Sequence, residues 1–187
     1  MKSVVDIILK ELENLAKEIH QEELETVCEI MCSAQKEGKK IFLAGAGRSG
    51  CVVRAFANRL MHLGFICHFV GEITTPPLKE GDILFVLSGS GRTESLVKMA
   101  EKTKQCHGRI LTMTLQKDGE IARMAEYSIV LPGNTRLQKD EGYTSMQPIG
   151  SNFEQLSWLT CDGLIMMMRD QLNLTNKEML AHHANLE

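Results

Sequence analysis

The apolar residues at the start of the chain recur at helical spacing. One series occupies residues 2–20 and another residues 22–37, with charged positions between the apolar ones. The first series is Val4, Val5, Ile8, Leu12, Leu15 and Ile19, and the second is Leu24, Val27, Ile30 and Met31. A period of about three to four residues is typical of an amphipathic helix. The pattern predicts an N-terminal helical pair over about 2–37, which carries no evident chemistry and packs on the domain or on a partner chain.

After residue 39 the pattern changes to short, nearly continuous apolar runs that alternate with helical segments. The runs are 40–44, 66–70, 82–87, 109–114 and 127–131. Such runs are typical of strands in a parallel sheet that is buried on both faces, with helices as the crossovers. The sequence therefore predicts an α/β fold of three layers, in which helices cover both faces of a five-stranded parallel sheet, of the flavodoxin-like or Rossmann-like kind.

The last part of the chain begins with a polar stretch over residues 132–150 and continues with a helical pattern. A loop of this length inside a compact domain is more often functional, or an assembly element, than idle. Thr175 starts a sequence that resembles a capping box, which predicts a short final helix. Because 187 residues suffice for one domain, we predict a single domain over 1–187, with C-terminal helices over about 153–184 that pack on it or on partner subunits.

Two loops rich in glycine and serine follow apolar runs and precede helical segments, at residues 45–50 and 88–93. In a parallel sheet this edge is where ligands bind. The start of a helix offers unpaired N–H groups and a partial positive charge, glycines allow close approach, and hydroxyls add donors. This combination suits the terminal oxygens of a phosphate monoester. The candidate phosphate-binding residues are Arg48, Ser49, Ser88, Gly89, Ser90, Gly91, Arg92 and Thr93.

Two other interpretations of these loops remain open. Residues 45–50 have the G-x-G-x-x-G spacing of a dinucleotide site, and Glu72 stands at the expected offset for the ribose hydroxyls. A dinucleotide site, however, has no need of a second serine-rich loop. The second interpretation is that both loops are tight turns that bind no ligand. A phosphate-binding P-loop is excluded, because no Gly-Lys-Ser/Thr follows four variable residues.

Composition and charge narrow the class of partner. The net charge of −3 gives no sign of broad affinity for nucleic acid or for an anionic membrane. The six cysteines include several within apolar runs, which is typical of reduced, buried thiols. Cys28 and Cys32 are one helical turn apart, but no second Cys/His pair has the spacing of a metal site, so we expect no metal. The N-terminus lacks a signal peptide, and the expected compartment is the cytoplasm.

The two loops and several further blocks resemble the sugar isomerase (SIS) family. The loop S-G-S-G-R-T at residues 88–93 is similar to the phosphate loop of that family. The other similar blocks are residues 44–50, 59–65, 70–72, 75–77, 147–155 and 182–187. These blocks resemble, more narrowly, the branch of the family that interconverts D-arabino-hex-3-ulose 6-phosphate and D-fructose 6-phosphate. Residues 115–146 contain few recognisable blocks.

The resemblance implies an isomerase of the ribulose monophosphate pathway, which fixes or releases formaldehyde beside a hexulose-phosphate synthase. It implies a sugar phosphate as the substrate, a 2,3-enediol intermediate, and neither a metal nor an organic cofactor. It also implies a homo-oligomer, typically a tetramer, in which subunits contribute to one another's sites.

Two residues, Glu154 and His183, are candidates for moving protons. Glu154 resembles the glutamate of the family that moves the proton, although an acid in the first turn of a helix is also common without any function. His183, or less favourably His182, could move protons between substrate oxygens or open a cyclic sugar, and histidine suits that task near neutral pH. A histidine pair at a frayed terminus is the alternative. Arg48 and Arg92 either add charge to the phosphate site or are solvated.

Three rival functions stay open at this point. A phosphosugar-binding regulator would keep the loops and have no use for Glu154. An isomerase of the same fold could act on another sugar phosphate, such as a pentose phosphate. A dinucleotide oxidoreductase would need a hydride-acceptor pocket, and the sequence identifies none.

Overall fold

The computed structural model describes residues 3–133 and 145–186. Within them, five strands form one sheet in the order β2-β1-β3-β4-β5, and every neighbouring pair is parallel. The strands are β1 (Lys40–Gly45), β2 (Ile66–Phe69), β3 (Ile83–Leu87), β4 (Arg109–Thr114) and β5 (Tyr127–Val130). The helices are α1 (Val4–Ala16), α2 (Gln21–Lys36), α3 (Gly47–His62), α4 (Glu94–Gln105), α5 (Glu120–Met124), α6 (Ser151–Gln171) and α7 (Asn176–Ala181).

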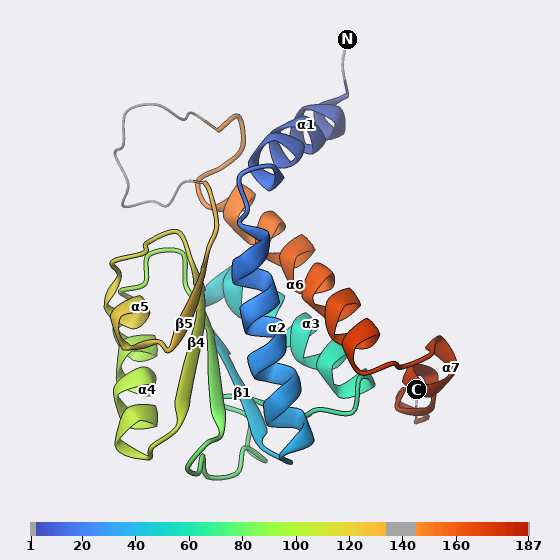
Figure 1. Cartoon of the computed structure of the whole chain (residues 1–187). Coiled ribbons are helices and arrows are strands. Elements are labelled where there is room, and N and C mark those ends of the chain that lie inside the picture. The colour runs from blue at the N-terminus through green and yellow to red at the C-terminus, as the bar shows by residue number, and fades with distance from the viewer. Residues whose placement is uncertain (1–2, 134–144, 187) are drawn as a thin grey trace.

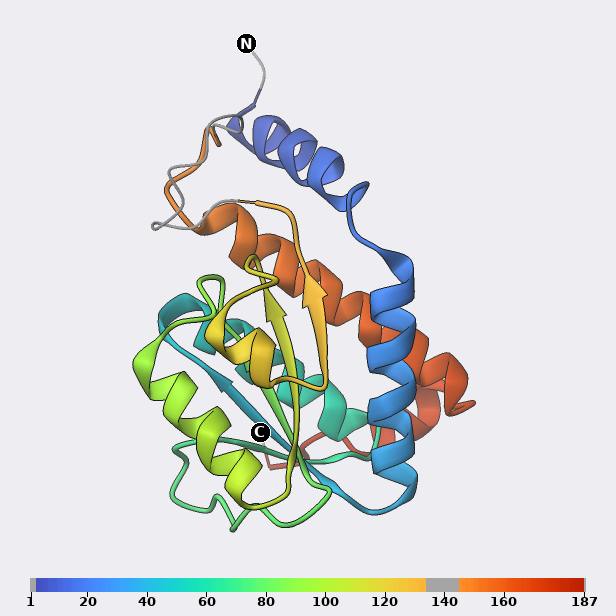
Figure 2. The same ribbon diagram turned by 60° about the vertical axis from the view of Figure 1, so that its left-hand side comes forward.

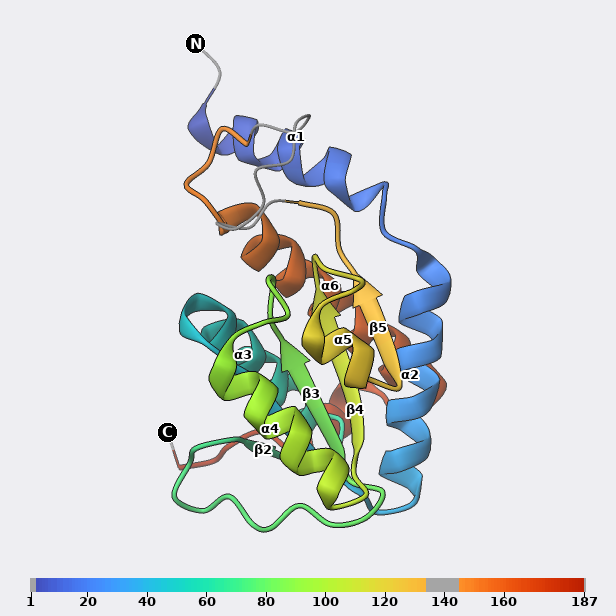
Figure 3. The same cartoon turned by 90° about the vertical axis from the view of Figure 1, so that its left-hand side faces the viewer.

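The predicted three-layer architecture is confirmed. Helices α2, α3 and α6 cover one face of the sheet, whereas α4 and α5 cover the other (Figures 1, 2 and 3). Each face has its own apolar cluster. The cluster under α4 and α5 is the smaller of the two and includes Leu84 and Val86.

Strand β3 shows why the sequence pattern is continuous rather than alternating. All five of its residues are buried. Successive side chains of a strand point to opposite faces, so Phe85 joins the cluster beneath α2, α3 and α6 while Leu84 and Val86 join the other. A central strand covered on both sides therefore needs an apolar residue at every position.

The two ends of the chain pack differently. Helix α1 lies beyond the carboxyl edge of the sheet and contacts the beginning of α6 (Figure 1). Its Leu12 and Leu15 are buried, but Val5 and Leu9 are more than half exposed. At the other end α7 begins with the predicted capping box, because the Thr175 hydroxyl accepts from Glu178 N–H and the Glu178 carboxylate accepts from Thr175 N–H. No helix in the described ranges is long and apolar enough to cross a membrane.

The polar stretch predicted over residues 132–150 lies largely outside the described residues. Of it, 132–133 and 145–150 are described, and the segment ends at Gly150, whose φ of +90° forms the left-handed N-cap of α6.

Gly45 and Gly50 meet backbone to backbone where β1 passes into α3. A methyl group on Gly50 would lie 2.8 Å from the carbonyl oxygen of Gly45, which is closer than real Cβ contacts. The close return of the chain thus requires glycine at both positions. By contrast, a methyl group on Gly163 in α6 would meet open space.

We expect Gly50→Ala to lower the free energy of unfolding by about 1–3 kcal/mol, because the added methyl group overpacks a backbone contact. The matched change Gly163→Ala should leave it unchanged or raise it by about 0.5–1 kcal/mol, because alanine favours a helix interior. Urea denaturation followed by circular dichroism measures both values. Equal stability of the two variants would contradict the close contact at Gly50.

Candidate functional site

The two glycine- and serine-rich loops lie side by side at the carboxyl edge of the sheet. Strand β1 pairs with β3, and Gly45 stands opposite Leu87 at the last position of that ladder. The chain leaves β1 towards β2 on one side and returns to β3 on the other. This is the point at which the strand order reverses, where open α/β sheets bind their ligands.

The second loop is folded into a tight turn by its own serines. The buried hydroxyl of Ser88 accepts a hydrogen bond from Gly91 N–H at 3.2 Å, and the Ser90 hydroxyl accepts one from Arg92 N–H at 3.3 Å. Gly91 has a φ of +61°, a conformation that favours glycine. Arg92 at the tip is exposed.

Helices α3 and α4 begin at these two loops without a capping side chain. Ala46 is the N-cap of α3 and Thr93 that of α4, and neither makes a side-chain hydrogen bond to the helix. The N–H groups of the first turn have no partner within a helix. Two such helix starts, next to the hydroxyls of Ser49, Ser90 and Thr93, form a cradle that can hold the oxygens of a phosphate.

Glu154 is held against the first loop by an ion pair. Arg48 Nε donates to Glu154 Oε2. The Glu154 side chain is 17% exposed and that of Arg48 is 67% exposed, so the carboxylate is the shielded partner. Glu154 lies in the first turn of α6, directly after the left-handed Gly150. The structure therefore brings a carboxylate from α6 to the edge of the sheet where the phosphate cradle lies.

An open groove of about 590 Å³ adjoins this ion pair. Helices α1, α3 and α6 form its walls, and most of the lining is apolar, including Leu9, Trp158 and Leu159. These three side chains are about half exposed. Arg48 and Glu154 are the charged residues in the lining.

His183 lies far from the ion pair of Arg48 with Glu154. Its ring stacks on that of His62, with the centroids 4.9 Å apart and the planes at 16°. His62 is the last residue of α3, and Arg48 is the second. Fourteen residues of helix span about 21 Å at 1.5 Å each. A single chain therefore does not bring His183 to Glu154.

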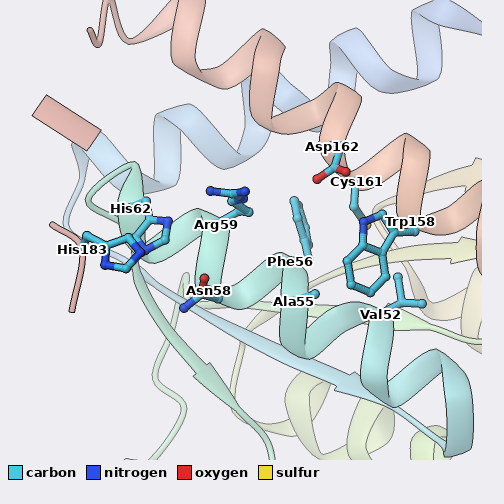
Figure 4. Close-up of a pocket in the computed structure, with 10 residues that line it drawn as sticks. All are labelled: Val52, Ala55, Phe56, Asn58, Arg59, His62, Trp158, Cys161, Asp162 and His183. Carbon is cyan, nitrogen blue, oxygen red and sulfur yellow. The ribbon is translucent and has the colours of Figure 1, made fainter. Parts of the chain in front are cut away.

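The two histidines stand at one end of a cavity of about 300 Å³ between α3 and α6 (Figure 4). His182 supports the arrangement, because its Nδ1 donates to the carbonyl oxygen of His62 at 3.1 Å. His62 is buried. Burial, and then the nearby His183, Arg59 and His182, lower the pKa of His62 below its ordinary value.

Arg59 and His62 lie within the block of residues 59–65 that resembles the family, and the sequence assigned no role to either. The spacing of three residues was the available signal for their shared surface. The stacking of His62 on His183 joins residues that are far apart in the chain, and no local sequence pattern predicts it.

Two other features bear on the alternative interpretations as a dinucleotide site and as a metal site. Glu72, the residue expected at the ribose hydroxyls of a dinucleotide, instead pairs with Arg54 of α3 at 3.1 Å. Within the described part of the chain no cluster of three or more His, Cys, Asp or Glu side chains could hold a metal ion. Cys28 and Cys32 are buried in α2, where the Cys28 thiol contacts Gln171.

A five-stranded parallel sheet with two glycine- and serine-containing loops at its reversal point is typical of α/β domains that bind phosphorylated ligands. Residues 36–149 match the SIS domain family, and the chain belongs to that family.

Individual relatives narrow the comparison. The chain is 43% identical to the 3-hexulose-6-phosphate isomerase of Bacillus subtilis, over 96% of this chain and 95% of that protein. It is 39% identical to the enzyme of the same name from Mycobacterium gastri, over 79% and 74%. A Methanococcus jannaschii protein, whose crystal structure led to an inferred function of 3-hexulose-6-phosphate isomerase, superposes with a TM-score of 0.82 at 34% identity, over 98% of both chains.

We expect His62 to titrate below its ordinary pKa of about 6.5. Because the folded state binds this proton less readily than the unfolded state, the contribution of neutral His62 to stability is complete above about pH 6.5 and is lost as the pH falls below it. His183→Ala should raise the pKa of His62 by removing a neighbouring positive charge and part of the burial. NMR titration of the histidine Cε1 signals measures the pKa of His62 in the wild-type chain and in the variant. An unchanged pKa of His62 in His183→Ala would contradict the stacking.

Proposed function

We propose that this chain interconverts D-arabino-hex-3-ulose 6-phosphate and D-fructose 6-phosphate. The observation that carries the proposal is the position of Glu154, which Arg48 holds against the first of two phosphate-type loops. A module that only binds a sugar phosphate needs the loops and has no use for a shielded carboxylate next to them. Two of the relatives named above match nearly the full length of this chain and support the same reaction.

In this proposal the loops hold the 6-phosphate. The uncapped starts of α3 and α4 supply N–H groups, and Ser49, Ser90 and Thr93 supply hydroxyls. Arg92 lies exposed at the tip of the second loop, where it adds positive charge from the solvent side. The phosphate thus fixes one end of the sugar, and the carbon chain extends towards α6.

Glu154 then acts on C2 and C3. Its carboxylate removes the proton from C2 of the 3-ketose, the electron pair forms the C2–C3 double bond, and O3 takes a proton. The enediol collapses when the O2 proton leaves, and Glu154 returns its proton to C3. One base serves both carbons because both lie on the same face of a planar enediol. Positioned acid–base catalysis of this kind contributes about 10²–10⁴ in rate.

The hydroxyl protons need a second group, and His183 is our candidate. Since about 21 Å of α3 separates it from the ion pair, we propose that it serves the site of a second copy of the chain. The half-exposed apolar side chains of Leu9, Trp158 and Leu159 beside Glu154 offer a surface for that copy. The homo-oligomer proposed here is a tetramer.

The proposed setting is the ribulose monophosphate pathway in the cytoplasm, with a hexulose-phosphate synthase as the neighbouring enzyme. All six cysteines are free thiols. A reducing compartment keeps thiols in this form.

We expect Glu154→Gln to lower kcat by a factor of about 10²–10⁴, because the amide cannot accept the C2 proton. Binding of fructose 6-phosphate should persist, since the loops are unchanged. The assay supplies fructose 6-phosphate and a hexulose-phosphate synthase and measures the formaldehyde released, while calorimetry measures binding.

Glu101→Gln is the matched control, because Glu101 pairs with Lys98 on the exposed surface of α4. It should retain wild-type kcat. Full activity of Glu154→Gln would contradict the role of Glu154. Binding of fructose 6-phosphate by a wild-type chain that releases no formaldehyde would favour a regulator or an isomerase of another sugar.

A mixing experiment tests the shared site. We expect Glu154→Gln and His183→Ala each to be impaired alone. If pairs of subunits exchange residues, unfolding and refolding an equal mixture should restore about a quarter of wild-type activity, because half of the pairs are hybrid and one of the two sites in each is intact. Activity that stays at the mean of the two variants would show that one chain supplies both groups.

A further inference from the structure

The second loop rests on the end of strand β4. The carbonyl oxygen of Gly89 accepts two hydrogen bonds from that strand end, one from Leu115 N–H at 3.2 Å and one from the Thr114 hydroxyl at 3.3 Å. Thr114 is fully buried. Its hydroxyl oxygen in turn accepts from Gln116 N–H at 3.1 Å, so the side chain is fixed from both sides.

The direction of this carbonyl sets the direction of the next N–H group. In a planar trans peptide the C=O of one residue and the N–H of the following residue point opposite ways. Because the Gly89 oxygen is bound to the end of β4, the N–H of Ser90 points away from β4. Among the described residues this N–H donates no hydrogen bond, and it is left to a ligand in the cradle.

The connection between β4 and α5 supports the same loop at Gly91. Gly91 packs against Gly119, where an added Cβ would lie 3.2 Å from the Gly119 Cα, and Ile121 N–H donates to the Gly91 carbonyl oxygen at 3.1 Å. The same added Cβ would lie 3.5 Å from Thr114 Oγ1. The loop is thus held from behind by backbone on two sides, and Thr114 is the side chain in that support.

We propose that Thr114 is a positioning residue for phosphate binding. It holds the Gly89–Ser90 peptide so that an N–H group, rather than a carbonyl oxygen, faces the phosphate. This inference rests on the proposed function, because it assigns the phosphate to the same loop. Without the hydroxyl only Leu115 N–H restrains the Gly89 carbonyl, and a rotated peptide would present a carbonyl oxygen to the anion.

The chain offers a matched control on the same strand. Thr112 is also fully buried, and two residues earlier its side chain lies on the same face of β4. Its hydroxyl donates to the carbonyl oxygen of Val86 at 2.9 Å. Val86 lies within strand β3, so Thr112 supports the sheet and not the loop.

We expect Thr114→Val to raise the KM for fructose 6-phosphate by about tenfold, as the loss of one well-placed hydrogen bond does. Its kcat should stay within about twofold of the wild-type value, because Glu154 is untouched. The inhibition constant of inorganic phosphate should rise by the same factor as KM. Thr114→Ser keeps the hydroxyl and should restore both values. Thr112→Val should lose stability to a similar extent yet keep the wild-type KM.

The outcomes separate the two proposals. Wild-type KM and wild-type phosphate inhibition in Thr114→Val would overturn the positioning role, as would an equal rise in Thr112→Val. A wild-type chain without isomerase activity that still binds fructose 6-phosphate would overturn the proposed reaction alone, and the Kd values of the same variants would then test Thr114. A wild-type chain that binds neither fructose 6-phosphate nor inorganic phosphate would overturn both.

Discussion

The pairing of β1 with β3 is the constraint on which the site depends. The ladder ends with Gly45 opposite Leu87, so the two loops leave the sheet at the same level. A slip of one residue would turn every side chain of β3 to the other face and bury the wrong set against each helical layer. Because all of β3 is buried, packing on both faces fixes the register. The same packing therefore sets the distance between the loops.

Helices α3 and α6 extend from that edge as rigid supports. Gly150 turns the chain so that α6 starts beside α3, and Glu154 in its first turn reaches Arg48. The far end of α3 carries His62, with His183 stacked on it. Because α3 fixes the distance between its two ends, the stacking of His183 on His62 keeps His183 about 21 Å from the ion pair of Arg48 with Glu154. Under the proposed reaction, oligomerisation is then a condition of catalysis rather than an addition to stability.

Local patterns in the sequence were sufficient for the sheet and for both loops. Continuous apolar runs marked the five strands, because strands buried on both faces tolerate few polar residues. The short helix α5 was missed, since five residues carry too little periodicity. The ion pair of Arg48 with Glu154 and the stacking of His62 on His183 join positions more than a hundred residues apart. Such contacts arise from tertiary packing, and the family resemblance alone pointed to Glu154 and His183.

In the proposed site the phosphate is held mainly by backbone N–H groups, and this reliance explains the pattern of supporting residues. Each loop carries one arginine, of which Arg48 is paired with Glu154 and Arg92 is exposed, and the chain as a whole carries a net charge of −3. An amide donor attracts an anion only when its peptide is correctly oriented, whereas a charged side chain can reorient itself. The residues behind the loops must therefore hold the loop peptides in one fixed orientation. Under the proposed phosphate binding, that requirement accounts for the buried hydroxyl of Thr114 and for glycines at 91 and 119, where the backbones touch.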